Sequence, residues 1–180
     1  ICRSDQMKEN HLVFGAKSRN GTIPYTSGVY YSLKRVFNNN FYYIGNLYAL
    51  RQWHVHIRSQ FVGSELPSQL HDGLIATVKI GIEERIRQLD HLHQKMAETK
   101  IMEGPHHEFQ EGWLRIKKVL KELLPFSGAD DLGERFTKII EQQIQAHGEN
   151  YINAIRGLTP DQAGIGTQWM ESIVQRVYKE

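Results

Sequence analysis

The stretch ELPSQLHDGLIATVKIGIEERIRQLDHLHQKMAE, residues 65–98, has the pattern of one long amphipathic helix. Its apolar side chains recur at spacings of three, four or seven residues: Leu70, Leu74, Val78, Ile82, Ile86, Leu89 and Met96. Such spacing places them along one face of an α-helix, which can be buried while the charged residues face water. We therefore expect this segment to be a helix that packs against other helices.

The segments that follow show the same periodicity. Residues 105–125 carry a heptad-like seam of Phe109, Trp113, Ile116, Leu120 and Leu123. Residues 127–157 are expected to form one helix, with Ser127 as its N-cap and Gly157 as its left-handed terminator. The last helix begins at TPDQ, residues 159–162, whose residues have the order of a capping box with proline at the first helical position. Short loops between such helices favour antiparallel packing around a shared core.

The N-terminal third fits two periodicities. In residues 27–61, apolar side chains recur at helical spacing, yet Val29, Tyr31 and Leu33 alternate as in a strand, with Asn38–Asn40 as a hairpin turn. We favour helix because the three- and four-residue spacing persists over the longer run, and we expect the asparagines to interrupt it. Upstream, HLVFGA (11–16) is expected to be a short strand and Asn20-Gly21 a tight turn.

These patterns predict a mainly α fold, a bundle of about five or six helices with an irregular or partly β N-terminal segment. Residues 1–64 form a basic, aromatic-rich segment and residues 65–180 a helical bundle, unless the whole chain is one continuous domain. The 180 residues are 40% hydrophobic and 23% charged, which suits a folded chain with a real core.

Charge is spread unevenly along the chain. Residues 1–64 carry eight basic and two acidic residues, whereas residues 65–180 carry 14 basic and 18 acidic ones. No Asp or Glu occurs between Asn10 and Ser64. Ten of the 18 aromatic residues fall between Tyr25 and Phe61. Cations neutralise phosphates or carboxylates and aromatic rings stack or anchor, so this composition suits contact with a negatively charged partner.

We therefore expect a binding module rather than an enzyme, which captures its partner by charge and then buries aromatic rings. The candidate binding residues are Arg19, Lys34, Arg35, Arg51, Arg58, Tyr30, Tyr42, Tyr43 and Trp53. A single-stranded nucleic acid, an acidic protein surface and the acidic half of a second copy all fit as partners. The alternative is a helical-bundle enzyme or small-ligand sensor with a pocket lined by histidine and aspartate, as in a metal-dependent hydrolase.

The histidines supply the residues for that alternative. In QWHVHIRS (52–59), His54 and His56 share a face only if the segment is a strand. His71 and Asp72 form a His-Asp pair of the kind that contributes to metal sites in one class of phosphohydrolases. A tetrahedral metal site needs further ligands, and no neighbouring motif supplies them. His91 and His93 lie inside the long helix and cannot share one ion.

No other motif indicates catalysis. Phosphate-binding glycine loops, nucleophile elbows and paired metal-binding helices are absent, so we expect no cofactor. The single cysteine, Cys2, cannot form an internal disulfide. No apolar run is long enough for a membrane span, and no signal peptide is evident, so we expect a cytoplasmic chain. Because it begins with Ile1, we expect a piece of a longer protein.

Overall fold

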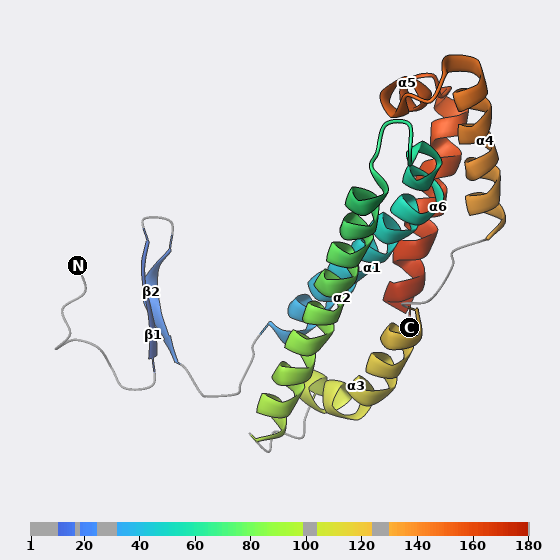
Figure 1. Cartoon of the computed structure of the whole chain (residues 1–180). Coiled ribbons are helices and arrows are strands. Elements are labelled where there is room, and N and C mark those ends of the chain that lie inside the picture. Colours follow the sequence, from blue (N-terminus) through green and yellow to red (C-terminus); the bar gives the residue numbers. More distant parts are fainter. Residues whose placement is uncertain (1–10, 17–18, 25–31, 99–103, 124–129, 180) are drawn as a thin grey trace.

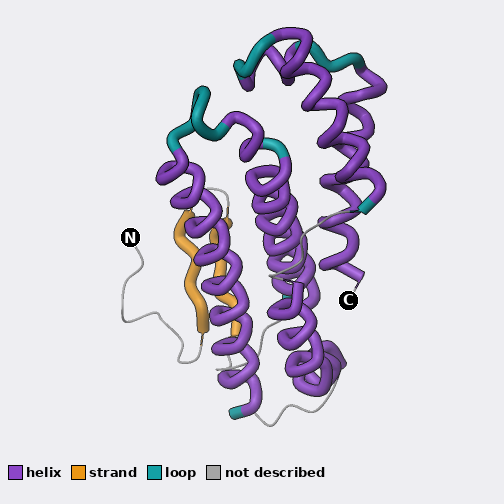
Figure 2. The backbone as a smooth tube through the Cα atoms, turned by 45° about the vertical axis from the view of Figure 1, so that its right-hand side comes forward, coloured by secondary structure: helices purple, strands orange, loops and turns teal. Residues whose placement is uncertain are grey.

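The structure is a computed structural model that describes residues 11–16, 19–24, 32–98, 104–123 and 130–179 (Figure 1). The elements in chain order are β1 (His11–Ala16), β2 (Arg19–Pro24), α1 (Leu33–His56), the 3₁₀-helix η2 (Arg58–Phe61), α2 (Ser68–Ala97), α3 (Gly104–Leu123), α4 (Asp131–His147), α5 (Tyr151–Arg156) and α6 (Pro160–Lys179). The predicted mainly α bundle with a partly β N-terminal segment is confirmed. The long helices run roughly side by side along the molecule (Figure 2).

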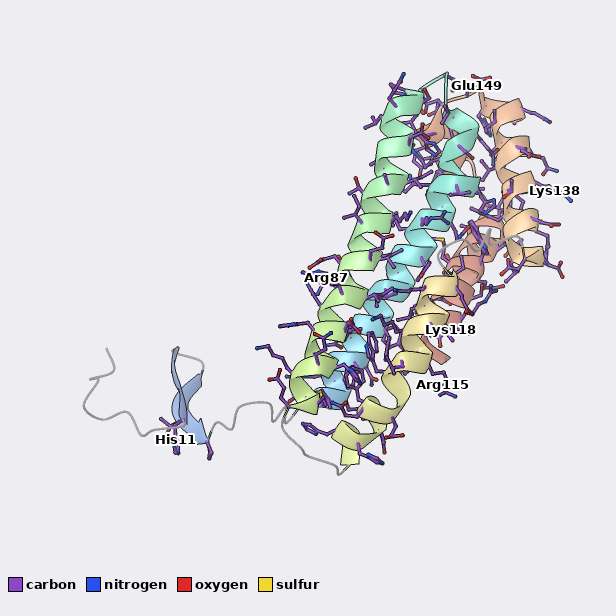
Figure 3. All side chains as sticks on the ribbon, turned by 60° about the horizontal axis from the view of Figure 1, so that its bottom comes forward. His11, Arg87, Arg115, Lys118, Lys138 and Glu149 are labelled. Atoms are coloured by element: carbon purple, nitrogen blue, oxygen red, sulfur yellow. The ribbon has the colours of Figure 1, made fainter. Side chains whose placement is uncertain are left out.

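β1 and β2 form a two-stranded antiparallel hairpin, which stands apart from the helices in Figures 1 and 3. The register pairs His11 with Pro24 and Ala16 with Arg19. The strand expected at 11–16 is therefore confirmed. The turn expected at Asn20-Gly21 is wrong, because both residues pair within the ladder, Asn20 with Gly15 and Gly21 with Phe14.

α1 is one unbroken helix of 24 residues, so over Leu33–His56 the helical interpretation is confirmed and the strand interpretation is wrong. Val29 and Tyr31, on which the strand interpretation also rested, lie outside the described residues. The interruption expected at Asn38–Asn40 is also wrong. The Asn40 side-chain amide donates to the Val36 carbonyl at 2.7 Å, which satisfies it within the helix. Phe37 and Ile44 are buried on either side of the asparagines, and their burial stabilises the helical path.

The single helix expected over residues 127–157 is two helices. α4 ends at Gly148, whose φ of 80° only glycine adopts readily. Asn150 then caps α5, because its side-chain oxygen accepts a hydrogen bond from the Asn153 amide at 2.9 Å. Gly157 has φ of −74°, so it is not the left-handed terminator that we expected.

Side-chain caps fix the starts of α4 and α6. Asp130 caps α4 by accepting from the Gly133 amide at 2.9 Å, whereas the expected cap, Ser127, lies outside the described residues. The predicted capping box of α6 is confirmed. The Gln162 amide donates to Thr159 Oγ1 at 3.3 Å, and the Thr159 amide donates to Gln162 Oε1 at 3.0 Å.

α1 is the centre of the bundle and packs on both α2 and α6 (Figure 1). α3 covers part of α1, where the Phe37 and Phe109 rings stack with centroids 3.9 Å apart. The Tyr48 hydroxyl donates to the Leu120 carbonyl and ties α1 to α3. Residues before and after the proposed boundary near residue 64 share one hydrophobic core.

The predicted apolar stripes are largely buried, with one correction in α2. Leu70 is 54% exposed, because His71, not Leu70, faces the core in the first turn and is 8% exposed. From Val78 onward the expected positions of α2 are buried as predicted. None of the described helices has both the length and the apolar character needed to cross a membrane.

Candidate binding surface

The solvent-exposed side of α1 carries a row of aromatic and polar residues, which we call the outer face of α1. It consists of Arg35, Asn39, Tyr42, Tyr43, Asn46 and Leu50, all exposed. At 100° per residue these six positions fall within an arc of about 100° on the helix. The period of α1 therefore gathers them on one face, although they span 16 residues of sequence.

Neighbouring helices hold the two exposed tyrosines in place. Tyr42 is 40% exposed and stacks on Tyr178 of α6, with ring centroids 4.5 Å apart. Tyr43 is 46% exposed, and the Arg85 guanidinium of α2 lies over its ring, 4.5 Å from the centroid. Such ring contacts are worth roughly 0.5–1.5 kcal/mol each. They orient both tyrosines before any partner arrives.

The N-terminal end of α1 is positively charged. Lys34 and Arg35 occupy its first turn and are exposed, and no acidic residue lies in that turn. The N-terminus of a helix already carries a partial positive charge, so acidic residues are the stabilising choice there. Two cations in this position raise the local potential at some cost to the helix, an arrangement that suits the capture of a negative group.

The other predicted binding residues do not join this face. Arg58 lies beyond the far end of α1, roughly 35 Å from Lys34 at 1.5 Å per residue. Its guanidinium lies 4.1 Å from the centroid of the Tyr151 ring. The Trp53 indole donates to the Tyr151 hydroxyl at 3.2 Å and packs on Phe136. Arg58 and Trp53 thus help to seat α5.

Of the three remaining candidates, Arg51 is half-buried, and the side chains of Arg19 and Tyr30 are not described. The charge of Arg51 acts on Tyr48, whose pKa burial raises well above its usual range. Arg19 belongs to β2, and the whole of Tyr30 lies outside the described residues. The nine predicted residues therefore do not form one patch. Arg35, Tyr42 and Tyr43 share the outer face of α1, and Lys34 is next to Arg35 in the first turn but on a different side of the helix.

The alternative histidine site is only partly assembled. His54 and His71 lie close, with ring centroids 6.4 Å apart, and the His71 Nε2–H donates to the His54 carbonyl at 2.9 Å. His56 points elsewhere, with Nε2 3.1 Å from Gln52 Oε1 and its ring edge-on to Trp169. Because α1 is a helix, His54 and His56 cannot face one ion.

Asp72 does not complete a metal site. Its carboxylate is 4.0 Å from His71 Nδ1 but is 83% exposed. Across the described ranges, no group of three or more His, Cys, Asp or Glu side chains is arranged to hold a metal ion. His54 Nδ1 is buried without a hydrogen-bond partner, and burial lowers the pKa of this imidazole, with His71 and Arg58 adding to the shift.

Two residues of the surface escaped sequence reasoning. Arg85 and Tyr178 reach the tyrosines of α1 from α2 and α6, 42 and 136 residues away in the chain. No local pattern marks either one, because the register between helices decides the contact.

Comparison of the chain with protein-family models, with curated proteins and with solved structures finds no match.

Proposed function

We propose that the protein is a non-enzymatic interaction module whose outer face of α1 binds an acidic surface of a protein partner. One observation carries the proposal: two exposed, pre-oriented tyrosines lie on the same helix face as Arg35, in a stretch free of acidic residues. Tyr and Arg are enriched among the residues that dominate binding energy at protein interfaces. Lys34 and Arg35 steer the encounter, and Tyr42 and Tyr43 become buried in the contact.

The state of the rings favours a protein partner over a single-stranded nucleic acid. A base needs an open ring face on which to stack. One face of Tyr42 is already covered by Tyr178, and one face of Tyr43 by Arg85. Each ring therefore offers a base at most one open face, whereas its hydroxyl group can still hydrogen-bond to a protein. Asn39 and Asn46 add amide groups on the same face.

A direct binding measurement tests this proposal. A fluorescein-labelled glutamate-rich peptide and a single-stranded oligothymidine of equal charge are titrated with the protein at low and at high salt. The peptide is expected to bind more tightly, with affinity that falls as salt rises, since charge drives the encounter. Tyr43→Ala is expected to weaken peptide binding by about tenfold.

Other outcomes of the titration would overturn the proposal. Tighter binding of the oligonucleotide would support the nucleic-acid alternative, and no binding of either probe at low salt would remove the charge-led mechanism. Sedimentation velocity of the protein alone at low salt separates a second copy from a different partner. A dimer that dissociates in the Tyr43→Ala variant would identify the acidic surface as that of another copy.

A further inference from the structure

A half-open groove of about 430 Å³ lies between α2 and α3. Its lining residues are Glu83, Ile86, Arg87 and Asp90 from α2, and Lys117 and Lys121 from α3. The volume falls in the range of small-molecule sites, roughly 300–1,000 Å³. Arg87 lies two residues after Arg85, about 200° further round α2, so the groove is separate from the outer face of α1.

Lys117 is held in place by a partly buried hydrogen-bond network with Asp90 and Trp113. Its ammonium nitrogen is 2.7 Å from Asp90 Oδ1, and the Trp113 indole N–H donates to the same oxygen at 2.9 Å. The Lys117 and Asp90 side chains are each only 25% exposed. An ammonium group has three N–H donors, so the bond to Asp90 leaves two for a ligand.

Arg87 forms a surface ion pair on the other side of the groove, where its side chain is 71% exposed. Its Nε and Nη2 donate to the two carboxylate oxygens of Glu84, both at 2.7 Å. The two N–H groups of Nη1 are not used in this fork. Figure 3 shows Arg87 projecting outward from α2. The Glu84 pair therefore orients the guanidinium without exhausting its donors.

The remaining lining residues complete a site with a charged rim and an apolar floor. Lys121 follows Lys117 by one helical turn and is exposed. Ile86 lies at the floor of the groove, and because it is only 3% exposed most of its side chain is already packed in the core. Of the two acidic lining residues, Asp90 is engaged by Lys117, and Glu83 lies 3.8 Å from Lys79. Three cations and two carboxylates therefore line the groove, a net charge of +1, and each of the two carboxylates is paired with a lysine.

We propose that the α2–α3 groove binds a small phosphorylated molecule, whose phosphate contacts Lys117, Lys121 and Arg87 and whose apolar part covers Ile86. A phosphate dianion offers three acceptor oxygens, which matches three separate cationic donors better than a carboxylate does. Pre-oriented donors lose less conformational entropy on binding, which is the advantage that the Asp90 and Glu84 contacts supply.

Phenyl phosphate is a suitable probe because it joins a phosphate to an apolar ring. The Trp113 indole N–H reports directly on the groove, since it donates to the Asp90 oxygen that Lys117 contacts. In ¹H–¹⁵N spectra, this resonance is expected to shift saturably on addition of phenyl phosphate. Inorganic phosphate is expected to bind more weakly, and phenol to cause no shift. The fully buried Trp169 indole serves as an internal control.

Matched lysine variants on α3 then test the role of charge. Lys121→Gln is expected to weaken phenyl phosphate binding by about tenfold. Lys118→Gln removes the same charge from the same helix, but Lys118 is not a lining residue and lies 3.7 Å from Glu122 (Figure 3). It is expected to bind as the wild type does. Both lysines are exposed, and equal unfolding midpoints check that both variants fold.

Three results would overturn the assignment. The first is an unmoved Trp113 resonance at millimolar phenyl phosphate. The second is an equal loss of binding in Lys121→Gln and Lys118→Gln, which would indicate nonspecific attraction to α3. The third is a shift with phenol as large as that with phenyl phosphate, which would indicate an apolar site without phosphate recognition.

Discussion

Gly45 of α1 packs directly on the backbone of Val174 in α6. A Cβ atom at position 45 would lie 3.1 Å from both the Cα and the carbonyl oxygen of Val174. Backbone atoms cannot rotate aside as a side-chain end can, so a methyl group would push the helices apart. The hydrogen side chain of Gly45 therefore sets the separation of α1 and α6 at their contact.

Gly45→Ala is expected to lower the free energy of unfolding by about 1–3 kcal/mol, because overpacking outweighs the better helix propensity of alanine. Urea unfolding followed by circular dichroism measures the change. Gly73→Ala in α2 is the control, since nothing lies within 4 Å of a Cβ at that position. It is expected to stabilise the protein by up to about 1 kcal/mol. Equal stabilisation by both substitutions would contradict the packing argument.

Asp90 links the stability of the α2–α3 contact to pH. Hydrogen bonds from Lys117 and from Trp113 hold the pKa of Asp90 below its usual value. The folded pKa is thus lower than the unfolded one of about 3.9, so the stabilisation is present above that pH. It is lost as pH falls through the folded pKa, where the carboxylate takes up a proton.

Asp90→Asn should therefore be less stable than the wild type at pH 7, with a gap that narrows below about pH 4. Urea unfolding of both proteins at a series of pH values measures this gap. A gap of constant size down to pH 3 would show that the charge of Asp90 has no part in it.

His54 should make the fold sensitive to mild acid. Burial, followed by the influence of His71 and Arg58, lowers the pKa of His54. In the unfolded chain the pKa of His54 is about 6.5, so below that pH the unfolded state binds a proton and the folded state does not. Acid therefore favours the unfolded state. Stability contributed by neutral His54 is therefore present above pH 6.5 and declines as pH falls toward the folded pKa.

His54→Gln should flatten the fall in stability just below pH 6.5, because glutamine does not titrate. Thermal unfolding between pH 5 and pH 8 compares the slopes. His91→Gln, at an exposed position of α2, should keep the slope of the wild type. If His54→Gln and the wild type have the same slope, another group is responsible for it.

The sequence predicts most of the helices because their signals are local. The three- and four-residue spacing of α2, α3 and α6 is confirmed, and so is the capping box at Thr159 and Gln162. The errors occur where one local signal outweighs another. At Asn38–Asn40 the burial of Phe37 and Ile44 outweighs the low helix propensity of asparagine. At Gly148 the absence of a side chain allows a positive φ, which ends α4 before the predicted helix end at Gly157.

The two candidate sites could be predicted only in part. The sequence itself shows that α1 contains no Asp or Glu, and the helical period places Tyr42 and Tyr43 on one face. The contacts that orient these tyrosines cannot be predicted in this way, because Tyr42 meets Tyr178 and Tyr43 meets Arg85 across helix pairs whose register depends on the whole core. The same holds for Asp90 and Lys117, which lie 27 residues apart on two helices.

The most direct test of the central claim is a comparison of two charge reversals in the peptide-binding assay. Lys34→Glu/Arg35→Glu reverses two exposed cations at the start of α1, and Arg135→Glu/Lys138→Glu reverses two exposed cations on α4. Lys138 is labelled in Figure 3. The first variant is expected to bind the glutamate-rich peptide at least about tenfold more weakly, while the second is expected to bind with close to wild-type affinity. An equal effect of the two variants, or none from the first, would contradict the central claim.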